Sequence, residues 1–262
     1  MARVIPFTRN RQAIYDLLTR AKRFHCSISG VYEYDVTDLL AAIERGRAAG
    51  RRVGLMACLV KATSLVLERH PRLNHHLFHG LLRKYEVDFE EVSCNLVVER
   101  EAQDGERLLF PVVIRDSNRL PLEDIHGIIK HHKEAPLDSL PQVQAIRRLE
   151  RLPRLLLRFA SYRIRSDHRF YRRYFGTYGL SSLVRRGWGG VAGHAVANTA
   201  ASFFPGTLVE RPCVAPDGAI RARTVLFVMV VVDHYLVDGA EVTEAMDSLR
   251  ALVERPDTLG LA

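Results

Sequence analysis

The chain has 262 residues, a formal net charge of +8 and 47% hydrophobic residues, which is enough apolar material for one sizeable core. It lacks a Gly/Ser linker, an internal repeat, the apolar core of a signal peptide and an apolar run long enough to span a bilayer. This excludes a membrane-spanning protein and predicts one cytoplasmic domain over residues 1–262.

The four cysteines are widely spaced and form no Cys-x-x-Cys pair, which argues against a disulfide framework or a zinc knuckle. All four are predicted to be buried thiols. They are Cys26, Cys58, Cys94 and Cys213.

The amino-terminal half alternates between strand-like and helix-like patterns. Residues 27–34 alternate as a strand, and Asp35 or Thr37 can cap a helix that runs to Gly50. Residues 55–68 predict a second, mostly buried helix. A hairpin follows, with strands at 91–98 and 108–114 and the turn residues Asp104 and Gly105 in a long loop.

The second half continues the mixture. In chain order the predicted elements are a short helix at 122–132, a strand at 178–184, a glycine-rich loop at 187–193 and a hairpin around Asp217-Gly218. That hairpin leads into a strand at 225–232 and a final helix at 240–253. The pattern predicts an α+β fold, with a mainly antiparallel or mixed sheet and helices packed on one face.

The segment Val225 to Ala240 is the most informative part of the chain. Its apolar run, rich in valine, predicts a strand buried on both faces, and the run ends on Asp233 and His234. A histidine held at a strand end can act as a general base near neutral pH, because its ordinary pKa is close to the working pH. Four residues later stands Asp238, and Gly239 suits a sharp turn before the last helix.

This His-x-x-x-Asp-Gly motif after an apolar strand resembles the catalytic segment of the 2-oxo acid dehydrogenase acyltransferases, or dihydrolipoamide acyltransferases, and of the related chloramphenicol acetyltransferases. Further matches follow the family's order along the chain. They are Val36–Leu40, Leu59–Thr63, Pro71–Asn74, Phe110–Asp116 and Gly176–Leu183. The resemblance implies a chloramphenicol acetyltransferase-like fold and a homotrimer, or a cage built from trimers. Because the chain begins at the catalytic part, we expect no lipoyl or subunit-binding domain.

The resemblance also implies roles for individual residues. His234 is the expected general base, and Ser181 falls on the position of the hydroxyl that stabilises the oxyanion. In the family these two residues meet across a subunit interface. Asp238 could be a second base, but the resemblance implies that it forms an ion pair with Arg11 and holds the histidine loop.

Two departures bear on the acyl donor. Tyr235 stands where the dehydrogenase acyltransferases usually have arginine, and Ser182-Leu183-Val184 replaces the usual Asn-Leu-Gly. These changes put a dihydrolipoyl donor in doubt and favour coenzyme A thioester as co-substrate, with no tightly bound cofactor. We expect a stand-alone acyltransferase that uses acyl-CoA, or a dihydrolipoyl or carrier thiol, and an unidentified acceptor. The alternative is a non-catalytic scaffold or assembly protein with this fold.

Two histidine clusters are candidates for metal binding. They are His75, His76 and His79, and His131 with His132. Neither cluster has a cysteine or carboxylate at metal-site spacing, so we interpret them as solvated histidines on a loop and at a helix end, and expect no metal.

The excess of positive charge is confined to residues 146–175, which hold ten arginines against Glu150 and Asp167. We interpret this segment as a basic amphipathic insertion. On one helical wheel its arginines form a narrow stripe beside an apolar face, and the stripe contains Arg147, Arg151, Arg154, Arg158 and Arg165. It could be a solvated face, or could dock an anionic membrane, an acidic acyl carrier protein or the phosphates of coenzyme A. Nucleic acid is disfavoured because no aromatic stacking platform accompanies the charge.

Overall fold

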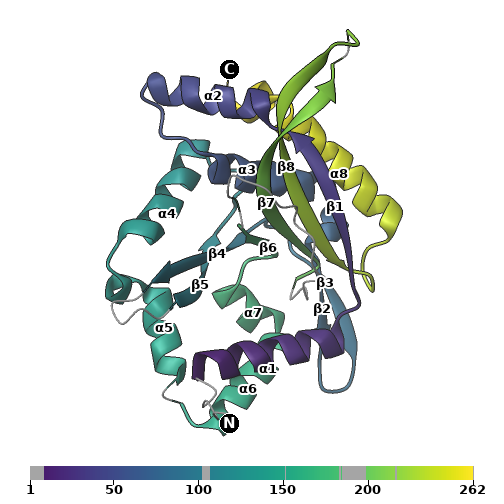
Figure 1. Cartoon of the computed structure of the whole chain (residues 1–262). Coiled ribbons are helices and arrows are strands. Elements are labelled where there is room, and N and C mark those ends of the chain that lie inside the picture. The colour runs from purple at the N-terminus through teal and green to yellow at the C-terminus, as the bar shows by residue number, and fades with distance from the viewer. Residues whose placement is uncertain are drawn as a thin grey trace, which may run out of the picture.

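The computed structural model describes residues 9–101, 107–150, 152–182, 184, 199–215 and 217–261. A six-stranded mixed sheet forms its centre (Figure 1). Across the sheet its strands are β1 (Ser27–Asp35), β8 (Ile220–Asp233), β7 (Ala201–Val214), β6 (Tyr178–Ser181), β4 (Cys94–Glu101) and β5 (Arg107–Ile114). The short strand β6 pairs in parallel with both β4 and β7, and the remaining pairs are antiparallel. The predicted mixed, mainly antiparallel sheet is confirmed.

The main core lies against one face of this sheet and is built largely from four helices (Figure 1). They are α2 (Thr37–Ala48), α3 (Leu55–Arg69), α4 (Leu122–Glu134) and α8 (Gly239–Val253). Alternation along β8 sends Leu226, Val228, Val230 and Val232 into this core. The helix α3 is buried along most of its length, which is why its sequence reads as nearly continuous apolar residues.

The opposite face of the sheet carries a smaller apolar cluster. Met229 and Val231 of β8 are buried there, with Phe204 of β7 packed against them. The β7–β8 hairpin turns at Gly218, whose φ of 79° suits glycine, so the predicted turn at this position is confirmed.

A second group of elements gathers at the end of the molecule away from α2 (Figure 1). It contains the helix α1 (Arg9–Phe24), the hairpin of β2 (His75–His79) and β3 (Lys84–Asp88), and the helices α5 (Pro141–Glu150), α6 (Arg154–Ser166) and α7 (His168–Tyr174). Phe78, Phe89 and Tyr171 form its buried aromatic centre. Short 3-10 turns complete the chain at Pro71–Asn74, Leu137–Ser139 and Pro256–Leu259.

Several sequence expectations were wrong. The basic segment is not one helix, because Pro153 separates α5 from α6 and the Asp167 side chain caps α7 by accepting the backbone N–H of Arg169 and Phe170. The continuous stripe from Arg147 to Arg165 therefore does not exist. The first helix, α1, was not anticipated.

The cysteines also divide differently from the expectation. Cys58 and Cys94 are buried, as predicted, but Cys26 is exposed and Cys213 is partly exposed. Cys213 lies toward the free end of the β7–β8 hairpin, beyond the helices that cover the sheet. Within the described part of the chain, no helix has the length and hydropathy needed to cross a bilayer. The predicted loop at 187–193 lies outside the described residues.

Candidate active site

His234 follows directly after β8 and is held by two hydrogen bonds. Its backbone N–H donates to the carbonyl oxygen of Cys26 at 2.7 Å, and its ring Nδ1 lies 3.0 Å from the carbonyl oxygen of Val237. A carbonyl oxygen only accepts, so Nδ1 carries the hydrogen in the neutral ring and Nε2 keeps its lone pair. The ring is partly exposed, and its free nitrogen can accept a proton from a bound nucleophile.

Asp233, the residue before His234, holds the loop of this histidine in place. Its side chain is fully buried and accepts hydrogen bonds from the backbone N–H groups of Cys26 at 3.0 Å and Tyr235 at 3.2 Å. Its second oxygen lies 2.6 Å from Nδ1 of His25. Burial by itself raises the pKa of the Asp233 carboxyl, but the hydrogen bonds from His25, Cys26 and Tyr235 outweigh it and lower that pKa. The carboxylate therefore stays charged and ties the loop of His234 to the start of β1.

Sequence reasoning placed Asp233 at the end of the apolar run without giving it a role, and it missed His25. A usable signal was present, because a carboxylate that ends a wholly apolar strand must find a partner when it is buried. Which partner it finds could not be read from the sequence, since His25 lies 208 positions away.

Asp238 stands four residues after His234. Its side chain is 82% exposed in the single chain, and its Oδ1 lies 3.8 Å from Nδ1 of His234. The carboxylate that is buried within the single chain is Asp233. Arg11 lies in α1, but its side chain is outside the described set, and its pairing with Asp238 stays a prediction.

Gly239 is the first residue of α8, and a Cβ added there would meet nothing within 4 Å. The sharp turn lies before it, at His234 to Leu236, where Leu236 N–H donates to the Asp233 carbonyl oxygen at 2.9 Å. Glycine is therefore not required by the turn, contrary to the sequence expectation.

Ser181 is the last residue of β6 and lies opposite Val97 of β4. Its side chain is partly buried, and alternation along β6 sends it to the face opposite the buried Leu180. Just before β6, Thr177 N–H donates to the Ser93 carbonyl oxygen at 2.7 Å, and Ser93 N–H donates to the Thr177 hydroxyl at 3.0 Å. The backbone at Gly176 lies so close to the backbone of Ser93 that a Cβ on Gly176 would be 2.5 Å from the Ser93 carbonyl oxygen. This contact fixes the register of β6 and hence the place of Ser181.

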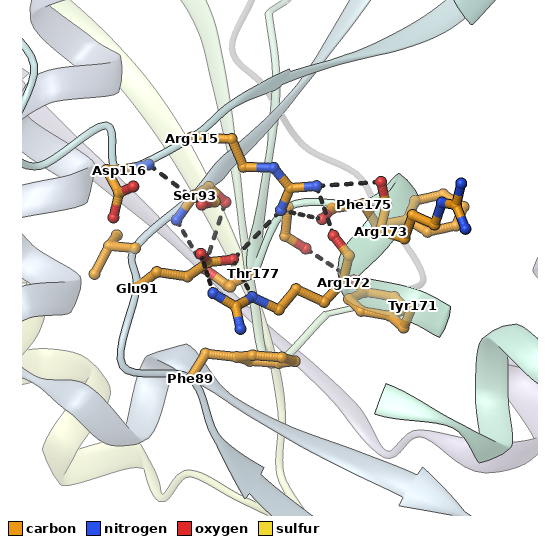
Figure 2. Close-up of polar contacts among 12 residues, drawn as sticks. Phe89, Glu91, Ser93, Arg115, Asp116, Tyr171, Arg172, Arg173, Phe175 and Thr177 are labelled. Carbon is orange, nitrogen blue, oxygen red and sulfur yellow. Dashed lines mark hydrogen bonds and ion pairs between the residues drawn. The ribbon is translucent and has the colours of Figure 1, made fainter. Parts of the chain in front are cut away.

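An ion-pair network anchors the end of the basic segment to the same region (Figure 2). The two oxygens of Glu91 accept hydrogen bonds of 3.0 and 2.8 Å from Arg172. Arg115 adds a contact of 3.3 Å to Glu91 and also donates to the carbonyl oxygen of Phe175 at 3.1 Å. The hydrogen bond from Arg172 is the main reason that the pKa of the Glu91 carboxyl is lowered. Arg172 is thus a structural anchor for the chain that enters β6.

His234 and Ser181 are far apart within one chain. The pairing of β6 with β7 and of β7 with β8 places Ser181 level with Met229, two strands away. His234 is five residues beyond Met229 along β8. At about 3.3 Å per residue and 4.8 Å per strand, their backbones are separated by roughly 15–20 Å. One copy of the chain does not bring the two side chains together.

The histidines at 75–79 form the strand β2 rather than a solvated loop. His75 lies 2.6 Å from Glu86, whereas His76 and His79 are buried. Burial among Phe78, Tyr171 and neighbouring rings lowers the pKa of His76 to about 3, so it stays neutral. Within the described ranges, no group of three histidine, cysteine or carboxylate side chains is placed to hold a metal ion. The pair His131-His132 does lie near the end of α4, as predicted.

The arginines of the predicted stripe lie in different environments. Arg147 pairs with Asp138, and Arg158 is exposed on α6. Arg151 and the side chain of Arg154 lie outside the described set. The guanidinium of Arg165 lies 4.1 Å from the centre of the Phe24 ring. A docking role for the first four arginines stays a prediction.

The sequence and the structure both resemble known proteins. Residues 1–139 and 196–261 match the family described as 2-oxoacid dehydrogenases acyltransferase (catalytic domain). The basic segment and Ser181 fall between the two matched ranges. No curated protein matches the sequence.

Solved structures that share the fold include the following three. A probable dihydrolipoamide acetyltransferase from Listeria monocytogenes 4b F2365 has a TM-score of 0.68 and 18% identity, over 97% of this chain and 94% of that one. The Azotobacter vinelandii dihydrolipoamide acetyltransferase (E2p) has a TM-score of 0.70 and 19% identity, over 99% of this chain and 94% of that one. The cubic core of a pyruvate dehydrogenase multienzyme complex has a TM-score of 0.70 and 17% identity, over 99% of this chain and 94% of that one.

The family match covers well over half of the chain, and the fold agrees with it. The chain therefore belongs to the catalytic-domain family of the 2-oxoacid dehydrogenase acyltransferases and is an acyltransferase.

Proposed function

We propose that this acyltransferase moves an acyl group between a coenzyme A thioester and a nucleophilic acceptor, with His234 as the general base and Ser181 as the oxyanion donor. The observation that carries the proposal is the hydrogen bond between Nδ1 of His234 and the carbonyl oxygen of Val237. It orients the ring and leaves Nε2 as the proton acceptor, as base catalysis requires.

The proposed reaction needs no group beyond the acyl donor and acceptor. Nε2 of His234 takes the proton of the acceptor while the acceptor attacks the thioester carbonyl. The tetrahedral intermediate carries its negative charge on oxygen, to which the Ser181 hydroxyl donates. Collapse of the intermediate expels the thiolate of coenzyme A, which takes the proton back from the imidazolium ring.

We place the complete site between two copies of the chain. The strand register separates Ser181 from His234 by far more than a reacting group can bridge, so a partner copy would have to supply one of them. The similar cubic core of the pyruvate dehydrogenase complex is an assembly of many copies, which supports a homotrimer or a trimer-based cage here.

The residue spacing supports the same assignment. A study of the Azotobacter vinelandii enzyme concerns a serine, a histidine and an asparagine in its catalytic mechanism. There the asparagine follows the histidine at the same distance as Asp238 follows His234. The serine and histidine are one position closer in sequence than Ser181 and His234. In this chain Asp238 stands in place of that asparagine, with its Oδ1 3.8 Å from Nδ1 of His234.

The test follows release of coenzyme A by chromatography from acyl-CoAs of increasing chain length, with dihydrolipoamide, alcohols and amines as acceptors. We expect turnover with at least one pair. His234→Ala should lower kcat by about 10²- to 10⁴-fold, the usual contribution of a general base, without changing the melting temperature. His131→Ala, at the exposed end of α4, is the matched control and should retain full activity.

Two results would contradict the proposal. One is an absence of turnover with every donor, including dihydrolipoyl and carrier-bound thioesters, which would favour a scaffold. The other is a His234→Ala variant as active as the wild type.

A further inference from the structure

The tip of the β2–β3 hairpin carries two adjacent leucines that touch almost nothing. Leu81 is 84% exposed and Leu82 is 95% exposed. Arg83 and Lys84 follow at once, and no acidic residue stands between His79 and Lys84. Within a single chain, two bulky apolar side chains in water contribute nothing to stability, so such a tip indicates a surface that contacts something else.

The helix α6 presents a second apolar surface. Leu155, Phe159 and Tyr162 recur at the i, i+4, i+7 spacing and therefore share one face. Leu155 and Phe159 are exposed, together with Leu156 beside them. On the opposite side of the helix, Ile164 packs against the aromatic cluster of Phe78, Phe89 and Tyr171. The helix is thus apolar on both sides, and only the inner side is covered.

These two surfaces are held together at one end of the molecule (Figure 1). An open hollow of about 360 Å³ lies between the hairpin tip and α6, and Phe24, residues 79–84, Tyr162 and Arg165 line it. The Tyr85 hydroxyl donates to the carbonyl oxygen of Ser166 at 2.8 Å, which fixes the hairpin against the end of α6. The leucine tip and the outer face of α6 form one surface, which we call the leucine tip surface.

Positive charge borders the leucine tip surface. Arg83, Lys84 and Arg158 are exposed around it, in a chain whose excess charge lies entirely in residues 146–175. Apolar side chains that project beside long basic side chains match the interface of an anionic bilayer, where leucines enter the acyl region and the basic groups reach the phosphates.

We propose that the leucine tip surface docks this protein on an anionic lipid bilayer. A protein partner would need its own complementary pocket for Leu81 and Leu82, whereas a bilayer accepts any projecting apolar group, and the basic border selects anionic lipid. The surface also adjoins the candidate active site, because Phe24 of the hollow precedes His25, which contacts Asp233 beside His234. Docking would bring the loop of His234 close to the membrane surface.

The test is co-sedimentation of the full chain with vesicles of phosphatidylcholine alone, or of phosphatidylcholine mixed with phosphatidylglycerol. The wild type should sediment with the mixed vesicles at low salt and weakly with phosphatidylcholine. Binding should fall as salt shortens the Debye length from ~10 Å at 0.1 M to ~3 Å at 1 M. Leu81→Ser with Leu82→Ser, and separately Leu155→Ser with Phe159→Ser, should each weaken binding by at least about ten-fold.

A matched control removes as much exposed apolar surface elsewhere. Val214 and Ile220 face each other near the tip of the β7–β8 hairpin and are 76% and 74% exposed. Val214→Ser with Ile220→Ser should leave vesicle binding unchanged. Unchanged melting temperatures would show that all variants fold.

The proposal is overturned if the wild type ignores anionic vesicles at low salt, or if the control weakens binding as much as the leucine variants do. Binding to an acidic carrier protein without binding to vesicles would also overturn it. Because sedimentation requires no turnover, the result is independent of whether the acyl transfer proposed above takes place.

Discussion

The Asp233 carboxylate and the His25 ring form a contact of 2.6 Å at the edge of the main core. Asp233 is the last residue of β8, and Ser27, two residues after His25, is its partner in the β1–β8 register. The contact therefore closes one end of the sheet directly behind His234. The strength of this contact decides how firmly His234 is held.

Replacing Asp233 should be costly. Asp233→Ala removes the acceptor for His25, Cys26 and Tyr235 together, and leaves three partly buried donors without this acceptor. We expect a loss of about 3 kcal/mol in the free energy of unfolding, measured by urea titration. Glu33→Ala, which breaks the exposed pair with Arg211, is the control and should cost less than about 1 kcal/mol. Equal losses in the two variants would show that the Asp233 contacts contribute nothing special.

The position of the site between copies can be tested by complementation. His234→Ala and Ser181→Ala should each be inactive, but a refolded equal mixture should recover activity in about a quarter of the sites, because each site takes one residue from each of two subunits. A mixture of His234→Ala with Ser182→Ala tests the neighbouring serine. Ser182→Ala copies keep both His234 and Ser181. That mixture should therefore show only the activity of sites whose His234 comes from a Ser182→Ala copy.

A complete absence of recovery, with mixed oligomers shown to form by mass measurement, would place both residues in one subunit. So would light scattering that shows a fully active monomer of the 29.7 kDa chain.

His76 should make the protein sensitive to mild acid. Burial lowers its pKa in the folded state to about 3, below the ordinary value near 6.5 that it regains on unfolding. The unfolded chain therefore binds the extra proton between these values, and stability that is fully present above pH ~6.5 is lost as the pH falls toward 3. We expect a loss of several kcal/mol at most, of order 1.4 per pKa unit.

The check is the melting temperature from pH 7 to 4.5 for three proteins. His76→Phe, which keeps an aromatic ring within the cluster, should flatten the slope relative to wild type. His131→Gln, at the exposed end of α4, should leave the slope as it is. An unchanged slope in His76→Phe would assign the acid sensitivity to other groups.

Two glycines should respond in opposite ways to alanine. Gly176→Ala places a Cβ 2.5 Å from the Ser93 carbonyl oxygen and 2.7 Å from the Asn95 nitrogen, and backbone atoms cannot move away without shifting β4. We expect a loss of at least about 2 kcal/mol in unfolding free energy. Gly239→Ala meets open space and should change stability by less than about 1 kcal/mol. Similar melting temperatures for the two variants would contradict this account.

The sequence by itself determined the elements whose pattern is local and strong. The buried strand before His234, the helices α3 and α8 and the turn at Gly218 follow from apolar periodicity and turn chemistry, which depend on neighbouring residues. The family resemblance came from the same segments. For these residues the local preference and the final fold agree.

Only the tertiary structure decided the environment of the polar groups. The strand at His75–His79 reads as polar, and it is buried because Phe89 and Tyr171, distant in sequence, pack on it. Asp233 contacts His25 across 208 positions, whereas Asp238 is exposed in the single chain. The distance between His234 and Ser181 depends on the order β8-β7-β6 in the sheet. Contacts of this kind are set by the packing of remote segments, and no pattern of neighbouring residues encodes them.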